Sequence, residues 1–248
     1  MKTKKRIIVL GITLLVFLII LTERSSIIKE PKLIEEVDEY TVLRKQMVDT
    51  QLRTRDISDE KVLKVMENVP RHKFMPSLLD QAYEDHPVPI GYGQTISQPY
   101  IVALMTQELN VDNEDIVLEI GTGSGYQAAV LAELVKEVYT IEIIRELALR
   151  ANNTLINLGY DNVHVKHADG YFGWPGKEFD AIIITAAANH IPPPLIEQLK
   201  EGGRLIIPLA SPSGFQTLTL VTKIKDTLDT RFITGVRFVP MTGEVQKR

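Results

Sequence analysis

The hydrophobic and polar positions of this chain change their period part-way along its 248 residues. In the first part, apolar residues recur at helical spacing, which predicts a helix over residues 33–52 and a second helix that Ser58 caps and Pro70 ends. Residues 85–100 are rich in glycine, proline and polar side chains, so we expect a loop there and then a helix over 99–109. These helices are expected to form an N-terminal cap on the main domain.

In the second part, short apolar runs alternate with helical segments. We expect strands at 116–120, 138–141, 163–166, 179–185 and 204–209, and helices at 126–134, 144–158 and 195–199. Strands that are apolar throughout and alternate with helices indicate a parallel sheet covered on both faces. Two β-rich runs follow, 217–224 and 231–239, and predict a closing antiparallel hairpin. The expected fold is therefore α/β, with a mostly parallel seven-stranded sheet, a C-terminal antiparallel hairpin and an N-terminal helical cap.

The first 25 residues differ from the rest. Basic residues precede an apolar run over residues 7–21, a pattern that is typical of a secretory signal or a signal anchor. This run is shorter than the roughly 20 residues that a full membrane span requires, and a buried N-terminal helix is the alternative. Residues 26–39 are charged and are expected to be a tether, so we place the globular domain at 40–248.

Composition excludes several kinds of chemistry. A net charge of −4 provides no global basic field for nucleic acid, and the absence of cysteine excludes disulfides, thiol nucleophiles and cysteine-ligated zinc. The five histidines show no metal-binding spacing, so we expect no metal site. A basic group is expected to form a solvated face; it consists of Arg53, Arg55, Arg71, His72 and Lys73.

A glycine loop follows the predicted strand at 116–120. Gly121, Gly123 and Gly125 have the spacing G-x-G-x-G, and Glu119 lies two residues before the first glycine. Glycines let a backbone turn tightly and approach a ligand closely. A dinucleotide site would favour G-x-G-x-x-G instead. The pattern resembles motif I of the Rossmann-like class I methyltransferases, in which this loop wraps the methionine and ribose part of S-adenosyl-L-methionine.

Two further carboxylates follow the next two predicted strands. Glu142 lies 21 residues after Gly121, where a carboxylate accepts both ribose hydroxyls of a bound nucleotide. Asp169 and Gly170 follow the strand at 163–166, and in the resembled family this aspartate contacts the adenine end. The three features together predict S-adenosyl-L-methionine as the cofactor, with a ligand-free doubly wound fold as the alternative.

Residues 89–100, PIGYGQTISQPY, are more specific. They closely resemble the signature of the protein-L-isoaspartate O-methyltransferases, whose loop reads much like G-x-G-Q-T-I-S-x-P. Residues 118–126, 180–187 and 237–241 agree, and the resemblance covers residues 42–244. It implies methylation of the free α-carboxylate of L-isoaspartyl residues, and of D-aspartyl residues as a further substrate, in damaged proteins. The methyl ester then closes to a succinimide, which begins repair.

The resemblance also implies roles for individual residues. Ser97 matches the family's catalytic serine, and we interpret it as a hydrogen-bond donor that orients the substrate. An α-carboxylate with a pKa of about 3.5 is ionised at neutral pH and needs neither a base nor a metal. The alternative for Ser97 is the N-cap of the helix at 99–109. Thr95, Ile96 and Val239 are expected to contact the substrate, and Thr242 or Gln246 could supply a polar contact to the cofactor.

Two other hypotheses remain open at this point. The chain could methylate another carboxylate or a small molecule, or it could be a membrane-tethered binding protein without catalysis. For the leading hypothesis, the expected partners are proteins or peptides that contain isoaspartyl residues, without nucleic acid, and the expected state is a monomer. Cofactor supply favours the cytoplasm, whereas residues 7–21 indicate membrane association or export.

Overall fold

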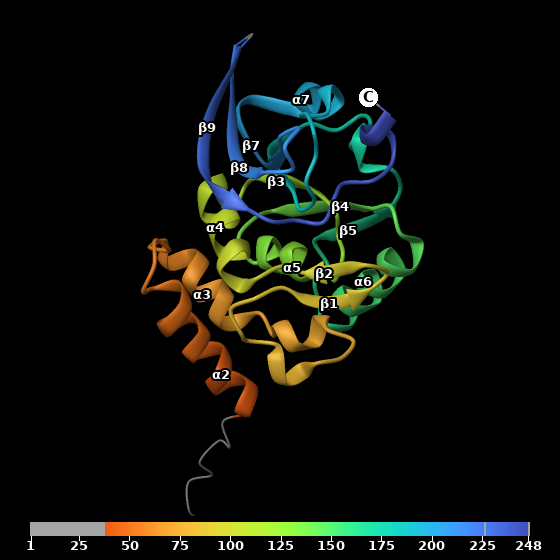
Figure 1. Cartoon of the computed structure of the whole chain (residues 1–248). Coiled ribbons are helices and arrows are strands. Elements are labelled where there is room, and N and C mark those ends of the chain that lie inside the picture. The colour runs from red at the N-terminus through yellow and green to blue at the C-terminus, as the bar shows by residue number, and fades with distance from the viewer. Residues whose placement is uncertain (1–37, 226, 248) are drawn as a thin grey trace, which may run out of the picture. The chain divides into compact units, whose positions relative to one another are not determined.

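A seven-stranded sheet forms the centre of the computed structural model, which describes residues 38–225 and 227–247 (Figure 1). Its strands are β3 (Ile116–Ile120), β4 (Glu137–Glu142), β5 (Val163–His167), β6 (Phe179–Ile184), β7 (Leu199–Ala210), β8 (Gln216–Ile224) and β9 (Thr227–Val236). They stand in the order β5-β4-β3-β6-β7-β8-β9, parallel as far as β7 and antiparallel from β7 to β9. The predicted mostly parallel sheet with a C-terminal antiparallel hairpin is confirmed.

Both faces of the sheet are covered, which explains why the central strands are apolar throughout. Successive side chains of a strand point to opposite faces, so Val117 and Leu118 pack into different clusters of the core. Val117 shares its cluster with α4 (Pro99–Leu109), α5 (Tyr126–Ala132) and α6 (Arg145–Asn157). Leu118 shares its cluster with α7 (Pro193–Gln198) and Val245 near the C-terminus.

The N-terminal cap consists of α2 (Glu39–Met47), a π-helical turn over Val48–Leu52, and α3 (Glu60–Asn68). In Figure 1, α4 and α5 lie between this cap and the sheet. The predicted N-cap of α3 is wrong by one residue. The Asp59 carboxylate, not Ser58, accepts hydrogen bonds from the backbone N–H groups of Lys61 at 2.8 Å and Val62 at 3.4 Å.

The loop predicted over residues 85–100 contains a hairpin, so that prediction was incomplete. Strands β1 (Val88–Gly91) and β2 (Gln94–Ile96) pair antiparallel and bury Ile90 and Ile96. Tyr92 and Gly93 form the two-residue connection with φ of 56° and 70°, the conformation that tight hairpins require. The glycines mark a turn between two very short strands. Strands of three or four residues are too short to show an alternating pattern within a stretch that is rich in glycine and proline.

The second strand of the C-terminal hairpin begins earlier than predicted. β9 starts at Thr227, which pairs with Ile224, and it ends at Val236 instead of Val239. β9 is an edge strand whose first residues are exposed. Backbone pairing at an exposed edge needs no apolar side chains, so the hydrophobic pattern does not locate it.

The predicted solvated basic face is correct for Arg53, Arg55 and Lys73, which are exposed, but wrong for Arg71 and His72. Arg71 is fully buried beneath the cap. Its Nε donates to the Ala82 carbonyl at 2.8 Å, and its guanidinium lies 5.0 Å from the centre of the Tyr126 ring. The aromatic face and the long aliphatic stem allow this cation to pack inside.

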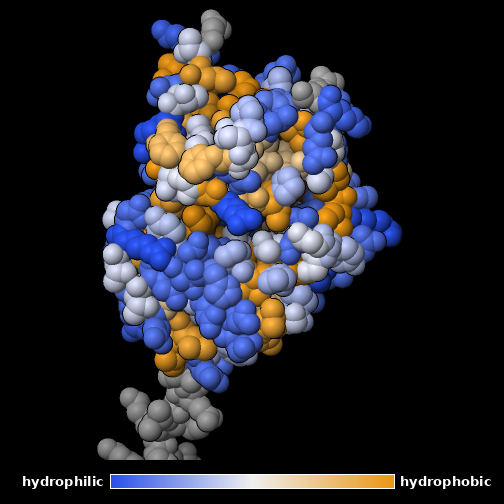
Figure 2. Space-filling model, in the orientation of Figure 1, coloured by the Kyte–Doolittle hydropathy of each residue, from blue (hydrophilic) through white to orange (hydrophobic). Residues whose placement is uncertain are grey.

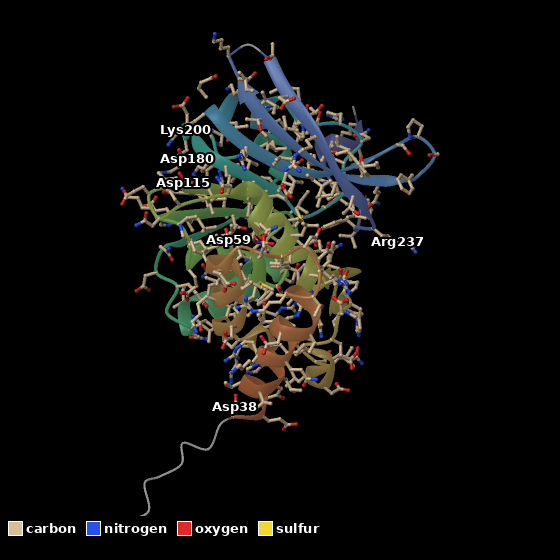
Figure 3. All side chains as sticks on the ribbon, turned by 90° about the vertical axis from the view of Figure 1, so that its left-hand side faces the viewer. Asp38, Asp59, Asp115, Asp180, Lys200 and Arg237 are labelled. Atoms are coloured by element: carbon tan, nitrogen blue, oxygen red, sulfur yellow. The ribbon has the colours of Figure 1, made fainter. Side chains whose placement is uncertain are left out.

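A polar cluster marks the end of the sheet where β3 and β6 begin. Lys200 Nζ lies 2.8 Å from both carboxylate oxygens of Asp180, and the backbone N–H of Ile116 donates to Asp180 at 2.9 Å. Figure 3 shows Asp115, Asp180 and Lys200 close together on one side of the molecule. The carboxyl ends of the parallel strands lie at the opposite edge.

Residues from Glu39 onward form a compact unit (Figure 2). Within the described residues, no helix combines the length and the apolar character that crossing a membrane would take. The predicted hydrophobic segment over 7–21 lies outside the described residues, as does the predicted tether except for Asp38 and Glu39.

Candidate active site

A cleft opens at the carboxyl ends of β3, β4 and β6, with about 820 Å³ of empty space that is partly open to solvent. The chain runs outward from β3 to β4 and β5, and then returns to the other side of β3 as β6. This reversal of strand order is the place where open α/β sheets bind ligands. The cleft is lined by the glycine loop, the ends of these strands, β2 and the segment after β9.

The glycine loop approaches the cleft with its backbone. Gly121 has a φ of 98°, a conformation that side chains rarely adopt, and a Cβ there would collide with Thr185 Oγ1. Its N–H donates to the Ile141 carbonyl at 2.8 Å, which ties the loop to β4. Gly123 also lines the cleft. Gly125 does not belong to the lining; its Cα packs against α6 near Ala151. Glycine therefore lets the loop fit between the sheet and a helix.

Glu142 stands at the end of β4, directly beside the glycine loop. Its Oε2 accepts from the Gly123 N–H at 2.8 Å, and its Oε1 accepts from the Ile144 N–H at 2.9 Å. The carboxylate lines the cleft and is 5% exposed. The two residues are 19 positions apart in sequence, and the structure brings them together. The two N–H donors fix the orientation of a carboxylate that faces the cleft.

Glu119 is fully buried and lines the same cleft. Its Oε2 accepts from the Thr140 hydroxyl at 2.5 Å, and Thr140 is in turn 2.6 Å from the Thr122 hydroxyl. Its Oε1 has no hydrogen-bond partner among the described residues. Burial raises the pKa of Glu119 to about 8; the hydrogen bond from Thr140 opposes this shift, and the charge of Glu142 adds to it. A bound donor or cation could satisfy the remaining oxygen.

Asp169 and Gly170 lie after β5. Asp169 accepts from the N–H of Tyr171 at 3.0 Å and from that of Glu244 at 2.8 Å, so its carboxylate joins the C-terminal segment to the sheet. Gly170 lines the cleft, and a Cβ there would collide with Ile120. Asp169 is not among the residues that line it. Near the C-terminus, Thr242 lines the cleft, whereas the Gln246 amide donates to the Met241 carbonyl at 3.1 Å.

A second cavity adjoins the first. It is lined by Pro87, Thr95, Ser97, Gln98, Ile101, Thr185, Phe215, Gly235, Val236, Arg237, Phe238 and Val239. Thr95, Ser97, Thr185 and Val239 line both cavities. Of these four, Thr95, Ser97 and Val239 are the residues that the sequence suggested for catalysis or substrate contact. The structure places all three where the two cavities meet. Ile96 lines only the first cavity and is buried.

Ser97 is not the N-cap of α4, so the capping interpretation was wrong. The capping position belongs to Gln98, and no side chain caps this helix end. The Gln98 amide instead donates to the Asp85 carbonyl at 3.0 Å and to its carboxylate at 2.8 Å, which holds the loop before α4 in place. Capping of α4 therefore does not compete for the Ser97 hydroxyl at the border of the two cavities.

Sequence reasoning missed Thr185. Its hydroxyl donates to the Gly121 carbonyl at 2.7 Å, and its side chain lines both cavities. Its position directly after β6 was the available signal, because ligands contact residues at the carboxyl ends of parallel strands. Across the described ranges, no group of three or more histidine, cysteine, aspartate or glutamate side chains is arranged to hold a metal ion.

Comparison with known protein families matches residues 43–246 to the Protein-L-isoaspartate(D-aspartate) O-methyltransferase family. The chain belongs to this family. A protein-L-isoaspartate O-methyltransferase 2 from Shewanella sediminis is 53% identical over 245 residues, which cover 98% of this chain and 97% of that relative. That alignment is longer than the described part of the chain, so it extends into the N-terminal 37 residues.

Other methyltransferases of the family agree with this assignment. A protein-L-isoaspartate O-methyltransferase from Opitutus terrae is 55% identical over 203 residues, 81% of this chain and 87% of the relative. A solved protein-L-isoaspartate O-methyltransferase structure has a TM-score of 0.76 and 31% identity, and the match covers 82% of this chain and 67% of that one. A Plasmodium falciparum structure, described as a family member in complex with S-adenosyl-L-homocysteine, has a TM-score of 0.71 and 28% identity over 80% of this chain and 98% of that one.

Proposed function

We propose that this enzyme transfers a methyl group to isoaspartyl carboxylates at the place where its two cavities meet. Membership of the family makes it an S-adenosyl-L-methionine-dependent protein carboxyl methyltransferase that acts on L-isoaspartyl residues in protein repair. The observation that carries the proposed location is the shared border formed by Thr95, Ser97, Thr185 and Val239. A reaction between two ligands requires such a border, because each ligand needs its own site.

The first cavity fits the cofactor. Glu142 presents an oriented carboxylate to ribose hydroxyls, and Gly121 and Gly170 let the backbone of the cleft wall pack closely against Thr185 and Ile120. Glu119 offers the unpaired Oε1 to a donor or to positive charge on the methionine part. The Plasmodium falciparum relative carries S-adenosyl-L-homocysteine, the product that remains after methyl transfer. When bound, S-adenosyl-L-methionine supplies a methyl group activated by the positive sulfonium.

The second cavity is assigned to the isoaspartyl segment, with Thr95 and Val239 contacting it beside Ile96. Ser97 donates its hydroxyl hydrogen to the substrate α-carboxylate and orients it. One carboxylate oxygen forms the bond to the methyl carbon as the carbon–sulfur bond breaks, and the bonding electron pair stays on sulfur. No proton moves, because a carboxylate with a pKa of about 3.5 is already ionised. The residues therefore act mainly by positioning, a known source of rate enhancement.

Labelled methyl transfer to matched peptides tests this function. The purified chain is mixed with S-adenosyl-L-methionine that carries a labelled methyl group and with either an L-isoaspartyl peptide or its L-aspartyl counterpart. We expect base-labile label in the isoaspartyl peptide alone. A D-aspartyl peptide tests the further substrate that the family description includes. Equal or absent labelling of the isoaspartyl and aspartyl peptides would refute the proposal.

The role of Ser97 predicts a specific loss. In Ser97→Ala the orienting hydrogen bond to an ionised group is absent, and such bonds contribute about 1.5–3 kcal/mol. We expect kcat/KM for the isoaspartyl peptide to fall by tenfold or more. Binding of S-adenosyl-L-homocysteine, followed by calorimetry, should stay within about twofold and shows that the cofactor site is intact. Unchanged peptide kinetics would remove Ser97 from the site.

Cellular location is a separate proposal. We propose that residues 7–21 associate with the membrane without crossing it, because this run is shorter than a full span, and that the methyltransferase domain stays in the cytoplasm, where S-adenosyl-L-methionine is made. The basic residues before this apolar run and its overall pattern support membrane association. We also propose that the enzyme acts as a monomer. Sedimentation of the purified protein would measure this state.

A further inference from the structure

Arg237 stands out among the residues that line the second cavity. The other eleven are uncharged, so Arg237 contributes the single charge among the described lining residues. It is exposed, and no hydrogen bond or ion pair between described residues involves its side chain. The chain as a whole has a net charge of −4, so this cation differs in sign from the overall balance. A groove with such a charge favours a negatively charged partner.

The backbone on the C-terminal side of Arg237 is held in place. Gln216 forms two hydrogen bonds with Phe238, accepting from its N–H at 2.6 Å and donating to its carbonyl at 3.1 Å. Further along, the Ala187 N–H donates to the Val239 carbonyl at 2.8 Å, and the Met241 N–H donates to Ala187 at 2.8 Å. The arginine side chain therefore extends from a fixed point of the cavity wall.

The distance to the reaction centre follows from the chain itself. Val239 lines both cavities, and Arg237 precedes it by two residues, so their Cα atoms are at most about 7.6 Å apart. An extended peptide advances about 3.3 Å per residue. Arg237 is thus placed opposite a substrate residue about two positions from the isoaspartyl residue.

Neighbouring groups leave the arginine available to a substrate. The lining residue Gln98 donates to the carboxylate of Asp85, which is also paired with Arg55. Phe215 is 62% exposed and lies next to Gly235, where it adds an apolar wall. Figure 3 shows Arg237 at the molecular edge opposite the side that carries Asp115, Asp180 and Lys200.

From these observations we infer that Arg237 is a specificity-determining residue that favours isoaspartyl sites with an acidic side chain about two residues away. The inference rests on the proposed function, because it assigns the second cavity to the substrate peptide. An exposed ion pair is worth about a twofold to fivefold change in affinity. The pair forms equally before and during methyl transfer, so the preference lies in KM and leaves kcat nearly unchanged.

Matched isoaspartyl peptides test the preference. Peptides that differ only in glutamate, glutamine or lysine, placed one or two residues to either side, are methylated by the full-length enzyme and by three variants. For wild type, we expect the KM of the best-placed glutamate peptide to be about twofold to fivefold below that of its lysine counterpart. Arg237→Ala should abolish the difference, Arg237→Glu should reverse it, and Arg237→Lys should retain it. High salt should weaken it.

A matched control separates local from general charge effects. Arg231 is an exposed arginine on β9, the strand that precedes Arg237; it is paired with Glu108 and lies outside the cavity lining, so Arg231→Ala should leave the preference intact. If Arg237→Ala keeps the preference, or if wild type methylates all peptides with the same KM, the inference is overturned while the proposed function stands. If no isoaspartyl peptide is methylated at all, the proposed function fails first.

Discussion

Glu119 shows how a single residue can carry more information in the structure than in the sequence. The spacing before the glycine loop predicted an acidic residue near the cofactor, and Glu119 does line the cleft. Its complete burial and the unpaired Oε1 could not be predicted, because they depend on side chains from β4 and on the packing of the sheet. Burial without full hydrogen bonding favours the protonated carboxyl group in the free enzyme.

This burial predicts a pH-dependent stability. The pKa of Glu119 in the folded protein is about 8, above its ordinary value, so its contribution to stability is present at low pH and is lost as the pH rises through about 8. Glu119→Gln stays neutral throughout. Between pH 5 and pH 9, we expect the free energy of unfolding of Glu119→Gln to gain at least about 1.4 kcal/mol relative to wild type. Urea titrations at several pH values measure this difference.

The control is Glu178→Gln, which changes an exposed glutamate outside the cleft lining. Its difference from wild type should be independent of pH. If the Glu119→Gln and wild-type curves run parallel from pH 5 to pH 9, Glu119 is ionised at neutral pH and the burial argument is wrong.

At the scale of elements, local pattern located most helices and strands well. The helix at 99–109 and the strand at 116–120 have the predicted bounds, because periodicity and a proline at the start define them within a few residues. The hairpin at β1 and β2 and the start of β9 were missed. These strands are too short or too exposed to show a hydrophobic pattern. Their positions depend instead on backbone pairing with the neighbouring strand.

The N-cap of α3 is an element-scale test. The Asp59 carboxylate accepts from the N–H groups of Lys61 and Val62, whereas the Ser58 side chain forms no cap. The backbone N–H groups of Ser58 and Asp59 both donate to the Gln107 side chain. Asp59→Ala should destabilise the protein by about 1 kcal/mol. For a domain of this size, this corresponds to a Tm decrease of about 2–4 °C. Thermal unfolding followed by circular dichroism measures it.

Ser58→Ala is the matched control for this cap, since the predicted and the observed capping residues are neighbours. It should change the free energy of unfolding by less than about 0.5 kcal/mol, as ordinary surface substitutions do. A larger loss in Ser58→Ala than in Asp59→Ala would favour the capping assignment first made from the sequence.

At the scale of the whole molecule, both cavities are built from residues 87–242. A chain that begins at residue 38 should therefore methylate an isoaspartyl peptide with kcat/KM within about twofold of the full chain. The reason is that catalysis by positioning depends on the lining residues and their supports. Labelled methyl transfer by the two purified proteins makes the comparison.

The same pair of proteins tests the proposed location. In cells, the full chain should sediment with membranes and the shortened chain should not, and added protease should leave the methyltransferase domain intact until the membrane is opened. Recovery of both chains in the soluble fraction would contradict membrane association. Digestion in intact cells would place the domain outside.

The sequence by itself determined the alternation of strands and helices, the glycine spacing, and the carboxylates at the end of β4 and after β5. These are short-range properties, because backbone period and turn geometry depend on neighbouring residues. Only the tertiary structure decided that Arg71 is buried, that Thr185 supports Gly121, and that two cavities share a border at Ser97. These features depend on residues distant in sequence that meet when the sheet and the segments around it pack.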